Sequence, residues 1–355
     1  MKITAIHAAK IDLELKKPFK VAIGYITKVD TVVVRIDTDE GISGFGEGSG
    51  IPFVTGETSQ SVLQTLKLFE KDLIGQNPFA IDHLHKLMDR TIVRNPAAKA
   101  AVDIALHDLC AKALGVPLYT FLGGVKRMVE TDLTIGIDTP ENMAQEAQEI
   151  ISRGFTQLKV KTGIDLADDI RSLRLIREAV GDQVKIKVDA NQGYTVTECL
   201  EFMEQVHDCD IELIEQPTPY WDVEGLLQIR KKASIPIMAD ESLMQVEDAV
   251  HLLRTGAVDM FNIKLMKCGG LHRGMQINAM AEAANVPTML GCMTESPLSI
   301  AAAAHLVSAC PNVQFVDLDS FLSFKDVGGV RHSFTIKGGM IDLGDAPGHG
   351  VEVDI

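Results

Sequence analysis

Three acidic residues recur at nearly even spacing in the second half of this 355-residue chain, each at the end of a short apolar run. Asp189 ends KVD, Glu215 ends LIE and Asp240 follows IMA, roughly 25 residues apart, which is the length of one strand–helix unit. Three carboxylates with open positions beside them are the oxygen ligands that Mg²⁺ prefers in proteins. Histidines and cysteines form no comparable set in the sequence, so zinc is not expected. The spacing therefore predicts a magnesium site.

Lysines flank these acids in the sequence. Lys159 and Lys161 (LKVK) precede them, and Lys264 (FNIK) follows them. A C–H bond beside a carboxylate is a very weak acid, and a bound cation with a lysine ammonium would stabilise the dianionic enediolate left by its proton. A lysine made neutral by burial and nearby cations could take that proton, and a second lysine could return one on the opposite face. Taken one at a time, each acid could be a helix cap and each lysine could be solvated. Six such charges at the ends of successive apolar runs favour a single functional site instead.

The elements that would position these residues are eight short β-rich runs separated by seven amphipathic helical stretches. The runs are residues 131–137, 155–161, 184–190, 211–216, 235–240, 258–264, 286–291 and 313–319. Strands that alternate with helices form parallel units, and eight of them close a TIM-type barrel with the strand ends at the active site. A doubly wound open sheet is the alternative, but no glycine fingerprint follows the first strand. We predict an α/β protein whose residues 126–324 form a modified TIM barrel, (β/α)7β.

The first 125 residues follow a different pattern. Alternating runs at residues 3–15 and 31–48 predict antiparallel strands, and residues 57–75 and 96–115 predict helices, which together indicate an α+β domain. The tail, residues 325–355, returns to strands and turns and is expected to pack back onto this domain.

Composition excludes several classes of function. The formal net charge of −15 argues against nucleic acid and against an acidic membrane surface as partners. The amino-terminal stretch does not have the apolar core of a signal peptide, and the six scattered cysteines indicate reduced thiols. We expect a soluble, cytoplasmic homo-oligomer that binds a small molecule.

These residues in this order resemble the enolase superfamily, in particular its muconate-lactonizing-enzyme subgroup. The resemblance covers nearly the whole chain and implies that the amino-terminal domain caps the barrel. It implies the following roles: Asp189, Glu215 and Asp240 hold Mg²⁺, Lys161 and Lys264 are the acid/base pair, Lys159 helps to neutralise the enolate, and Asn191 and Glu241 support the site from behind.

The eighth predicted strand carries two further acids in VDLD. Asp317 and Asp319 alternate with Leu318, so both carboxylates face the same side of a strand and could bind a cation such as a peptide's α-ammonium group. The pattern resembles the D-x-D of dipeptide epimerases, although a helix cap plus a solvated acid would look the same. We therefore expect a dipeptide epimerase that inverts the α-carbon of the C-terminal residue.

The loop after the first strand indicates which side chain the C-terminal residue of the substrate carries. Epimerases for Ala-Glu resemble this chain but carry an arginine where Gly24 stands. An apolar lining is predicted instead, from Phe19, Ile23, Tyr25, Ile26, Ile51 and Phe53, so a hydrophobic or aromatic second residue is expected. Lys28 could replace the arginine, which keeps L-Ala-D/L-Glu open as an alternative.

Three more residues are expected to contact substrate: Thr134, Cys292 and Met293. Cys292 is not expected to act as a nucleophile, because the sequence places no histidine to activate it. The alternatives are an N-acylamino acid racemase, an o-succinylbenzoate synthase or a cycloisomerase on the same scaffold, and a non-catalytic ligand-binding barrel.

Overall fold

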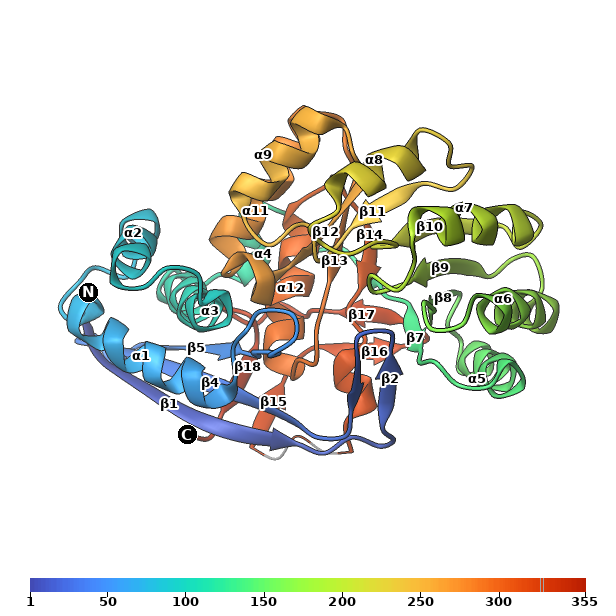
Figure 1. The fold of residues 1–355 in the computed structure, drawn as a ribbon. Coiled ribbons are helices and arrows are strands. Elements are labelled where there is room, and N and C mark those ends of the chain that lie inside the picture. Colours follow the sequence, from blue (N-terminus) through green and yellow to red (C-terminus); the bar gives the residue numbers. More distant parts are fainter. Residues whose placement is uncertain (326, 328) are drawn as a thin grey trace.

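The computed structural model describes residues 1–325, 327 and 329–355, and an eight-stranded parallel sheet is its centre (Figure 1). The strands lie side by side in chain order: β7 (Leu133–Ile135), β8 (Gln157–Lys161), β9 (Lys185–Asp189), β10 (Ile211–Glu215), β11 (Ile237–Ala239), β12 (Met260–Lys264), β13 (Thr288–Gly291) and β14 (Val313–Asp317). All eight predicted runs contain one of these strands, and the prediction of a barrel is confirmed. Leu213, Met238 and Met289 form a small apolar cluster of their own.

Helices connect the strands and surround the sheet in Figure 1. They are α5 (Pro140–Ser152), α6 (Leu166–Val180), α7 (Val196–Gln205), α8 (Val223–Arg230), α9 (Val246–Thr255), α10 (Leu265–Cys268), α11 (Leu271–Ala283) and α12 (Pro297–Ala309). Local sequence starts several of them: Thr139 and Asp165 cap α5 and α6, and Thr195 forms a capping box with Glu198 at α7. These caps fix where each strand-to-helix loop ends.

Side chains join the first and last barrel strands. Thr131 Oγ1 accepts a hydrogen bond from Leu318 N (2.8 Å), and Asp319 Oδ2 accepts one from Thr134 N (2.6 Å). The barrel interior also holds a buried ion pair between Lys187 and Asp132 (2.6 Å). Side-chain contacts therefore bring β14 and its acids next to β7.

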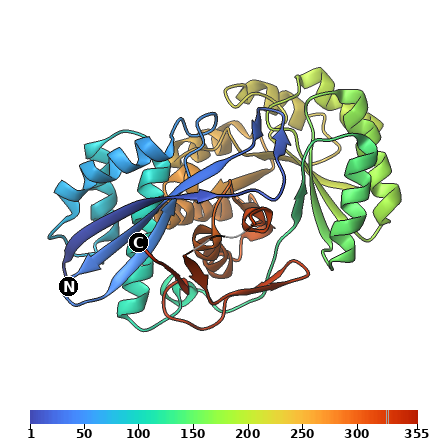
Figure 2. The same ribbon diagram turned by 90° about the horizontal axis from the view of Figure 1, so that it is seen from below.

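The amino-terminal domain packs beside the barrel. Its antiparallel sheet has the order β1 (Ile3–Leu13), β4 (Val29–Thr38), β5 (Ser43–Gly48), and its helices are α1 (Ser59–Leu73), α2 (Ile81–Thr91), α3 (Pro96–Ala113) and α4 (Leu118–Phe121). A small hairpin, β2 (Phe19–Val21) and β3 (Gly24–Ile26), extends from this sheet toward the barrel in both ribbon views (Figures 1 and 2). The sequence reasoning predicted the sheet, α1 and α3, and missed α2, α4 and the hairpin. The hairpin strands and α4 are too short to show a period, whereas α2 has Leu84 and Met88 one helical turn apart and could have been found.

The carboxy-terminal tail runs along the underside of the molecule and ends beside the amino-terminal sheet (Figure 2). It contains the strands β15 (Val330–His332), β16 (Thr335–Lys337), β17 (Met340–Asp342) and β18 (Val351–Val353), with β17 paired to β6 (Val129–Glu130). The 3₁₀ helix η1 (Ser320–Ser323) precedes the tail. His349 N donates to Asp108 of α3 (3.0 Å), and Arg35 of β4 donates to the Ile355 carbonyl (2.8 Å). Residues 326 and 328 of the predicted tail lie outside the described residues.

No helix in the described part of the chain is long and apolar enough to cross a membrane.

Candidate active site

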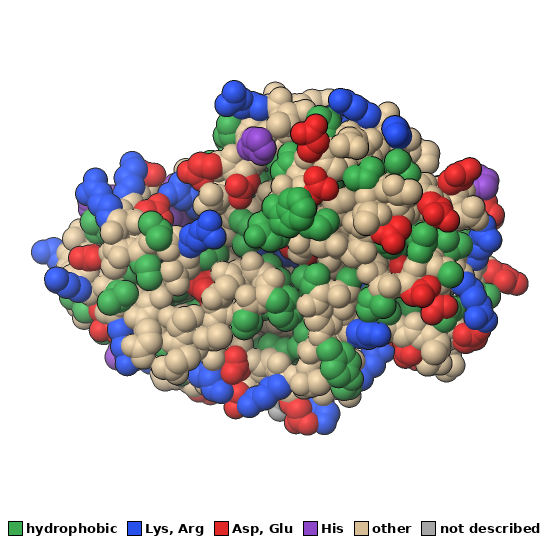
Figure 3. All heavy atoms as spheres, in the orientation of Figure 1, with side chains coloured by type: hydrophobic (Ala, Val, Ile, Leu, Met, Phe, Trp, Pro, Cys, Tyr) green, Lys and Arg blue, Asp and Glu red, His purple; other side chains and the backbone are tan. Residues whose placement is uncertain are grey.

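A cavity lies where the carboxyl ends of the barrel strands meet the amino-terminal domain. The space-filling view shows hydrophobic side chains gathered around a hollow near the centre of this face (Figure 3). The cavity is lined by charged residues of the barrel strands and by apolar residues of the β2–β3 hairpin and of residues 51–54. The fold thus brings both groups of predicted site residues to one place.

The three predicted metal ligands come together at the ends of β9, β10 and β11. Asp189, Glu215 and Asp240 are all buried, and one carboxylate oxygen from each lies within 4.8 Å of the others. Burial, together with the charge of Asp189, raises the pKa of Glu215 to about 8. Three buried carboxylates that present oxygen ligands at one point fit a divalent cation such as Mg²⁺, which would add positive charge beside the surrounding lysines.

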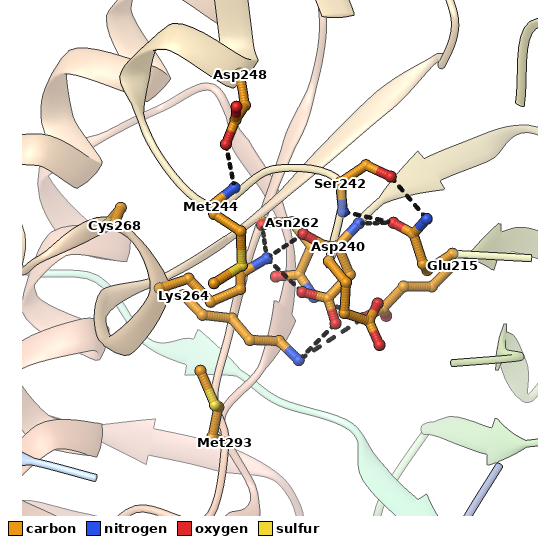
Figure 4. Close-up of polar contacts among 12 residues, drawn as sticks. Glu215, Asp240, Ser242, Met244, Asp248, Asn262, Lys264, Cys268 and Met293 are labelled. Carbon is orange, nitrogen blue, oxygen red and sulfur yellow. Dashed lines mark hydrogen bonds and ion pairs between the residues drawn. The ribbon is translucent and has the colours of Figure 1, made fainter. Parts of the chain in front are cut away.

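Polar groups behind Glu215 and Asp240 orient their carboxylates (Figure 4). Asn262 Nδ2 donates to Glu215 Oε1 (2.8 Å), and the Gln216 amide oxygen accepts from Asp240 N (2.9 Å). Lys267 forms a buried ion pair with Asp240 and also donates to its backbone carbonyl (2.6 Å). The sequence reasoning missed Asn262, Gln216 and Lys267. For Lys267 a signal existed, because a lysine three residues after Lys264 returns to the same side after one helical turn.

The two predicted acid/base lysines flank the triad. Lys161 Nζ lies 2.6 Å from Asp189 Oδ2 and 2.9 Å from Asn191 Oδ1, and Lys264 Nζ lies 2.9 Å from Asp240 Oδ2 (Figure 4). Lys161 ends β8 and Lys264 ends β12, with the three acid-bearing strands between them. Strands four apart in an eight-stranded barrel lie on opposite sides of it, so the lysines enter the mouth from opposite sides.

Charge in the site differs in one respect from the prediction. Burial opposes the charge of Lys264, as expected, but the carboxylates of Asp240, Glu215 and Asp189 together outweigh burial, so its pKa is raised overall. For the protein groups alone, the expected lowering is therefore not found at Lys264, because the carboxylates around it contribute more than burial and the ammonium of Lys159. A cation held by the same carboxylates would take up part of that negative charge.

Lys159 lies at the centre of the site. Its ammonium is 3.0 Å from Asp189, 2.9 Å from Glu215 and 2.7 Å from Asp317. Burial opposes its charge, but the surrounding carboxylates, Asp189 first, raise its pKa well above the usual value. The surrounding carboxylates therefore favour the charged form of Lys159.

Asp317 and Asp319 both line the cavity, as strand alternation predicted. Burial, with the charge of Asp317 added, raises the pKa of Asp319. Thr134 contacts Asp319 through its backbone, and Cys292 Sγ lies 3.8 Å from Asp319 Oδ1. Burial raises the pKa of the Cys292 thiol well above its usual range, so a thiolate is not available for nucleophilic chemistry.

The apolar wall agrees only in part with the sequence reasoning. Its members include the predicted Phe19, Ile23, Ile26, Ile51, Phe53 and Met293, together with Leu15, Val21, Val54 and Phe324, which were missed. Tyr25 was predicted to line the cavity and does not: it is 63% exposed, because alternate side chains of β3 point to opposite faces. Lys28 is also directed away, 3.6 Å from Asp12 on the outer surface. Gly24 itself lies under the ring of Phe53.

Such a fold and site define a class of barrel enzymes that place acid/base groups around an acidic cation site. Comparison with known proteins agrees. The pattern of the mandelate racemase / muconate lactonizing enzyme N-terminal domain matches residues 3–123, and that of the enolase C-terminal domain-like family matches residues 142–355. The chain belongs to this family of the enolase superfamily, and it is an isomerase of the racemase and epimerase kind.

Individual relatives of this chain act on dipeptides or on acylated amino acids. A hydrophobic dipeptide epimerase of Enterococcus faecalis is 42% identical over 355 residues, covering 99% of both chains. An N-succinyl-L-Arg/Lys racemase of Bacillus cereus is 37% identical over 359 residues, covering 100% of this chain and 96% of the other. The solved structure of the dipeptide epimerase from E. faecalis V583 with Mg and L-Leu-L-Tyr has a TM-score of 0.97 at 42% identity, covering 99% of this chain and 100% of that one. Similarity alone thus leaves the substrate open between peptides and acylated amino acids.

Proposed function

We propose that this protein is a magnesium-dependent dipeptide epimerase that inverts the α-carbon of the C-terminal residue. The observation that carries the proposal is the pair Asp317 and Asp319, which face the same cavity as Lys161 and Lys264. Two buried carboxylates side by side form a socket for a cation. Because Asp317 already pairs with Lys159 and the pKa of Asp319 is raised, Asp319 is the carboxylate that gains most from an incoming ammonium. A dipeptide has such a group, whereas an N-acylated amino acid does not.

The two charged ends of a dipeptide match the two ends of the site. Its α-ammonium would bind at Asp317 and Asp319, and its carboxylate would lie toward the cation site of Asp189, Glu215 and Asp240. Lys159, which contacts both groups of acids, would lie between these two ends of the peptide. The α-carbon next to the carboxylate would then lie between the two lysines at the mouth.

The reaction would be a 1,1-proton transfer. A neutral lysine on one side takes the α-proton onto Nζ, and the electron pair of the C–H bond passes into the carboxylate to give an enediolate. The protonated lysine on the other side then donates its proton to the opposite face of the same carbon, so the centre inverts and the two lysines exchange protonation states. Magnesium, when bound, supplies positive charge against the enediolate, and the fixed ammonium of Lys159 adds to it.

The side chain of the C-terminal residue would occupy the apolar part of the cavity. That wall is formed by aliphatic and aromatic groups of the hairpin and of residues 51–54, which favours a hydrophobic or aromatic residue. An acidic residue would need a cation there, and Lys28 is paired with Asp12 on the outer surface. The geometry therefore supports Ala-Phe or Ala-Leu over Ala-Glu.

The test is isotope exchange with a panel of dipeptides. L-Ala-L-Phe, L-Ala-L-Leu and L-Ala-L-Glu are incubated with the enzyme and Mg²⁺ in D₂O, and NMR follows deuterium at the α-carbon of the C-terminal residue. We expect exchange and inversion, fastest for the apolar peptides and abolished by EDTA. Fastest turnover of L-Ala-L-Glu would contradict the proposed side-chain preference, and absence of exchange from every peptide would leave a ligand-binding barrel instead.

Asp319→Asn separates the peptide reaction from the alternatives on this scaffold. Loss of the socket charge is expected to reduce kcat/KM for dipeptides by about 10- to 100-fold, because a charge-assisted hydrogen bond contributes roughly 1.5–3 kcal/mol. N-acetyl or N-succinyl amino acids, which have no ammonium, serve as comparison substrates. An equal effect of the substitution on both kinds of substrate would favour the racemase alternative. Asp138→Asn, an exposed aspartate at the start of α5, is the matched control.

A further inference from the structure

The backbone of the turn that follows Lys161 is hydrogen-bonded to a buried carboxylate that does not line the cavity. Asp169, in the first turn of α6, is 5% exposed, and its Oδ2 accepts a hydrogen bond from Gly163 N (2.8 Å). The same oxygen accepts a second hydrogen bond from the Tyr194 hydroxyl (2.7 Å). Neither Asp169 nor Tyr194 lines the cavity that holds the lysines. Their contacts are instead with the backbone that carries the site.

Tyr194 belongs to the turn after β9, which also carries a partner of Lys161. The Asn191 Oδ1 accepts from Lys161 Nζ (2.9 Å), and Asn191 N donates to Asp189 Oδ1 (2.9 Å). Asn191 has φ +38°, in the left-handed region that residues other than glycine rarely adopt. Such a conformation persists only where the surroundings hold it. Tyr194 N supplies one of those restraints by donating to the Pro217 carbonyl (2.9 Å).

The two turns also touch along their backbones. A Cβ added to Gly193 would collide with the Gly163 carbonyl oxygen, and one added to Gly163 would collide with the Ala190 carbonyl oxygen. Gly163 has φ +99°, which further requires glycine there. These hydrogen bonds and the chain of the turn from Asn191 to Tyr194 form a closed ring, which runs from the Lys161 ammonium to Asn191, along the turn to Tyr194 and through Asp169 back to the backbone just after Lys161.

The second lysine is held differently. Lys264 is followed directly by α10, whose own hydrogen bonds fix the backbone there, for example from Gly269 N to the Leu265 carbonyl (3.0 Å). The ring around Lys161 lies at β8 and β9, and Lys264 lies at β12. A change in the ring should therefore reach one lysine and spare the other.

We propose that Asp169 and Tyr194 are positioning residues for Lys161, which keep its ammonium at the α-carbon on one face of the substrate. The inference rests on the proposed two-lysine reaction. A misplacement of about 1 Å in a reacting group can cost roughly 100-fold in rate. Loosening the ring should thus slow proton transfer on the face served by Lys161, while transfer on the face served by Lys264 continues.

Asp169→Ala, Asp169→Asn and Tyr194→Phe test this inference. With each C-terminal stereoisomer of L-Ala-Phe in D₂O, NMR measures α-deuteration without inversion and inversion itself. We expect Asp169→Ala to reduce inversion about tenfold or more, whereas one isomer, whose α-proton faces Lys264, keeps its exchange within about threefold. Asp169→Asn, which keeps an acceptor oxygen, should recover most of the loss, and Tyr194→Phe should fall between. Asp168→Asn, an exposed neighbour on the same helix, is the control.

Equal losses of exchange on both isomers would overturn the inference, because a merely structural role predicts no preference between the faces. An unchanged rate in Asp169→Ala would overturn it as well. A crystal structure of Asp169→Ala is a second readout that does not depend on activity. The Lys161–Asn191 contact should be lost and the Lys264–Asp240 contact kept, and retention of both would contradict the proposal. If the wild-type enzyme processed no dipeptide, the proposed function would fail. The crystal structure of Asp169→Ala would then be the test of the positioning role.

Discussion

At the scale of single residues, the site brings buried carboxylates close enough to repel one another. Asp189, Glu215 and Asp240 converge in a buried space, and Lys159 contacts two of them and Asp317. The pKa of Glu215 is raised to about 8 because burial and Asp189 disfavour another negative charge. Acidic residues that raise each other's pKa in a cleft are typical of functional sites. A divalent cation bound by these carboxylates would offset their mutual repulsion.

The two lysines make a testable pair at this scale. Lys161→Ala and Lys264→Ala should each reduce epimerisation by about 10²–10⁴-fold, since each removes one acid/base group. Exchange in D₂O should persist on one stereoisomer in each variant, and on opposite isomers in the two. Lys185→Ala, an exposed lysine at the start of β9, is the matched control. Full loss of exchange on both isomers in both variants would argue against one base per face.

At the scale of elements, two segments of the amino-terminal domain meet over the barrel and line the apolar side of the cavity. Residues 50–57 are anchored at both ends: Ser49 Oγ donates to the Thr294 carbonyl (2.7 Å), and Glu57 accepts from Ala97 N (2.9 Å) at the start of α3. Phe53 lies between these anchors and rests on Gly24 of β3. The hairpin and this loop close the apolar side of the cavity together.

A methyl group at position 24 should disturb that contact. The Cβ of Gly24→Ala would lie 3.0 Å from Phe53 Cζ, so the ring or the hairpin must shift. We expect kcat/KM for L-Ala-L-Phe to fall about three- to tenfold in Gly24→Ala, and much less when Phe53→Ala is present as well. Steady-state kinetics of the two single variants and the double variant would measure the coupling. The same loss in both backgrounds would mean that the ring is not involved.

At the scale of the whole molecule, the barrel, the amino-terminal domain and the tail meet around buried histidines. His305 of α12 is 1% exposed, and its Nδ1 accepts from Tyr119 N of α4 (3.0 Å). Burial, with the nearby His349 added, lowers the pKa of His305 to about 3. His305 therefore stays neutral in the folded protein at pH values where it would be charged in the unfolded chain.

This shift has a defined sign for stability. Below its ordinary pKa of about 6.5 the unfolded chain binds a proton at His305, while the folded protein does not until pH approaches about 3. The contribution of neutral His305 to the free energy of unfolding is fully present above pH 6.5 and is lost as the pH falls. The loss is about 2 kcal/mol from pH 7 to pH 5. Urea unfolding should show this loss in wild type and not in His305→Gln. An identical pH dependence of the two proteins would contradict the assignment.

Much of this site could be predicted from the sequence because strand and helix periods repeat. In a parallel barrel the last residue of each strand faces the mouth, so Asp189, Glu215 and Lys264 could be found by counting. The pair Asp317 and Asp319 could be placed on one face by alternation alone. Contacts that depend on how separate loops meet could not be found in this way. Gln216, which accepts from Asp240 N, carries no periodic signal.

The sequence by itself determined the order of the strands, the residues at their ends and the chemistry that those residue types allow. These properties depend on distances along one chain. The tertiary structure alone decided that Tyr25 and Lys28 point away from the cavity, that Phe53 lies over Gly24, and that Asp169 holds the turn after Lys161. Each of these contacts joins segments that are distant in sequence or depends on how a short hairpin packs. Such contacts are set by the energy of the whole fold and not by local conformational preference.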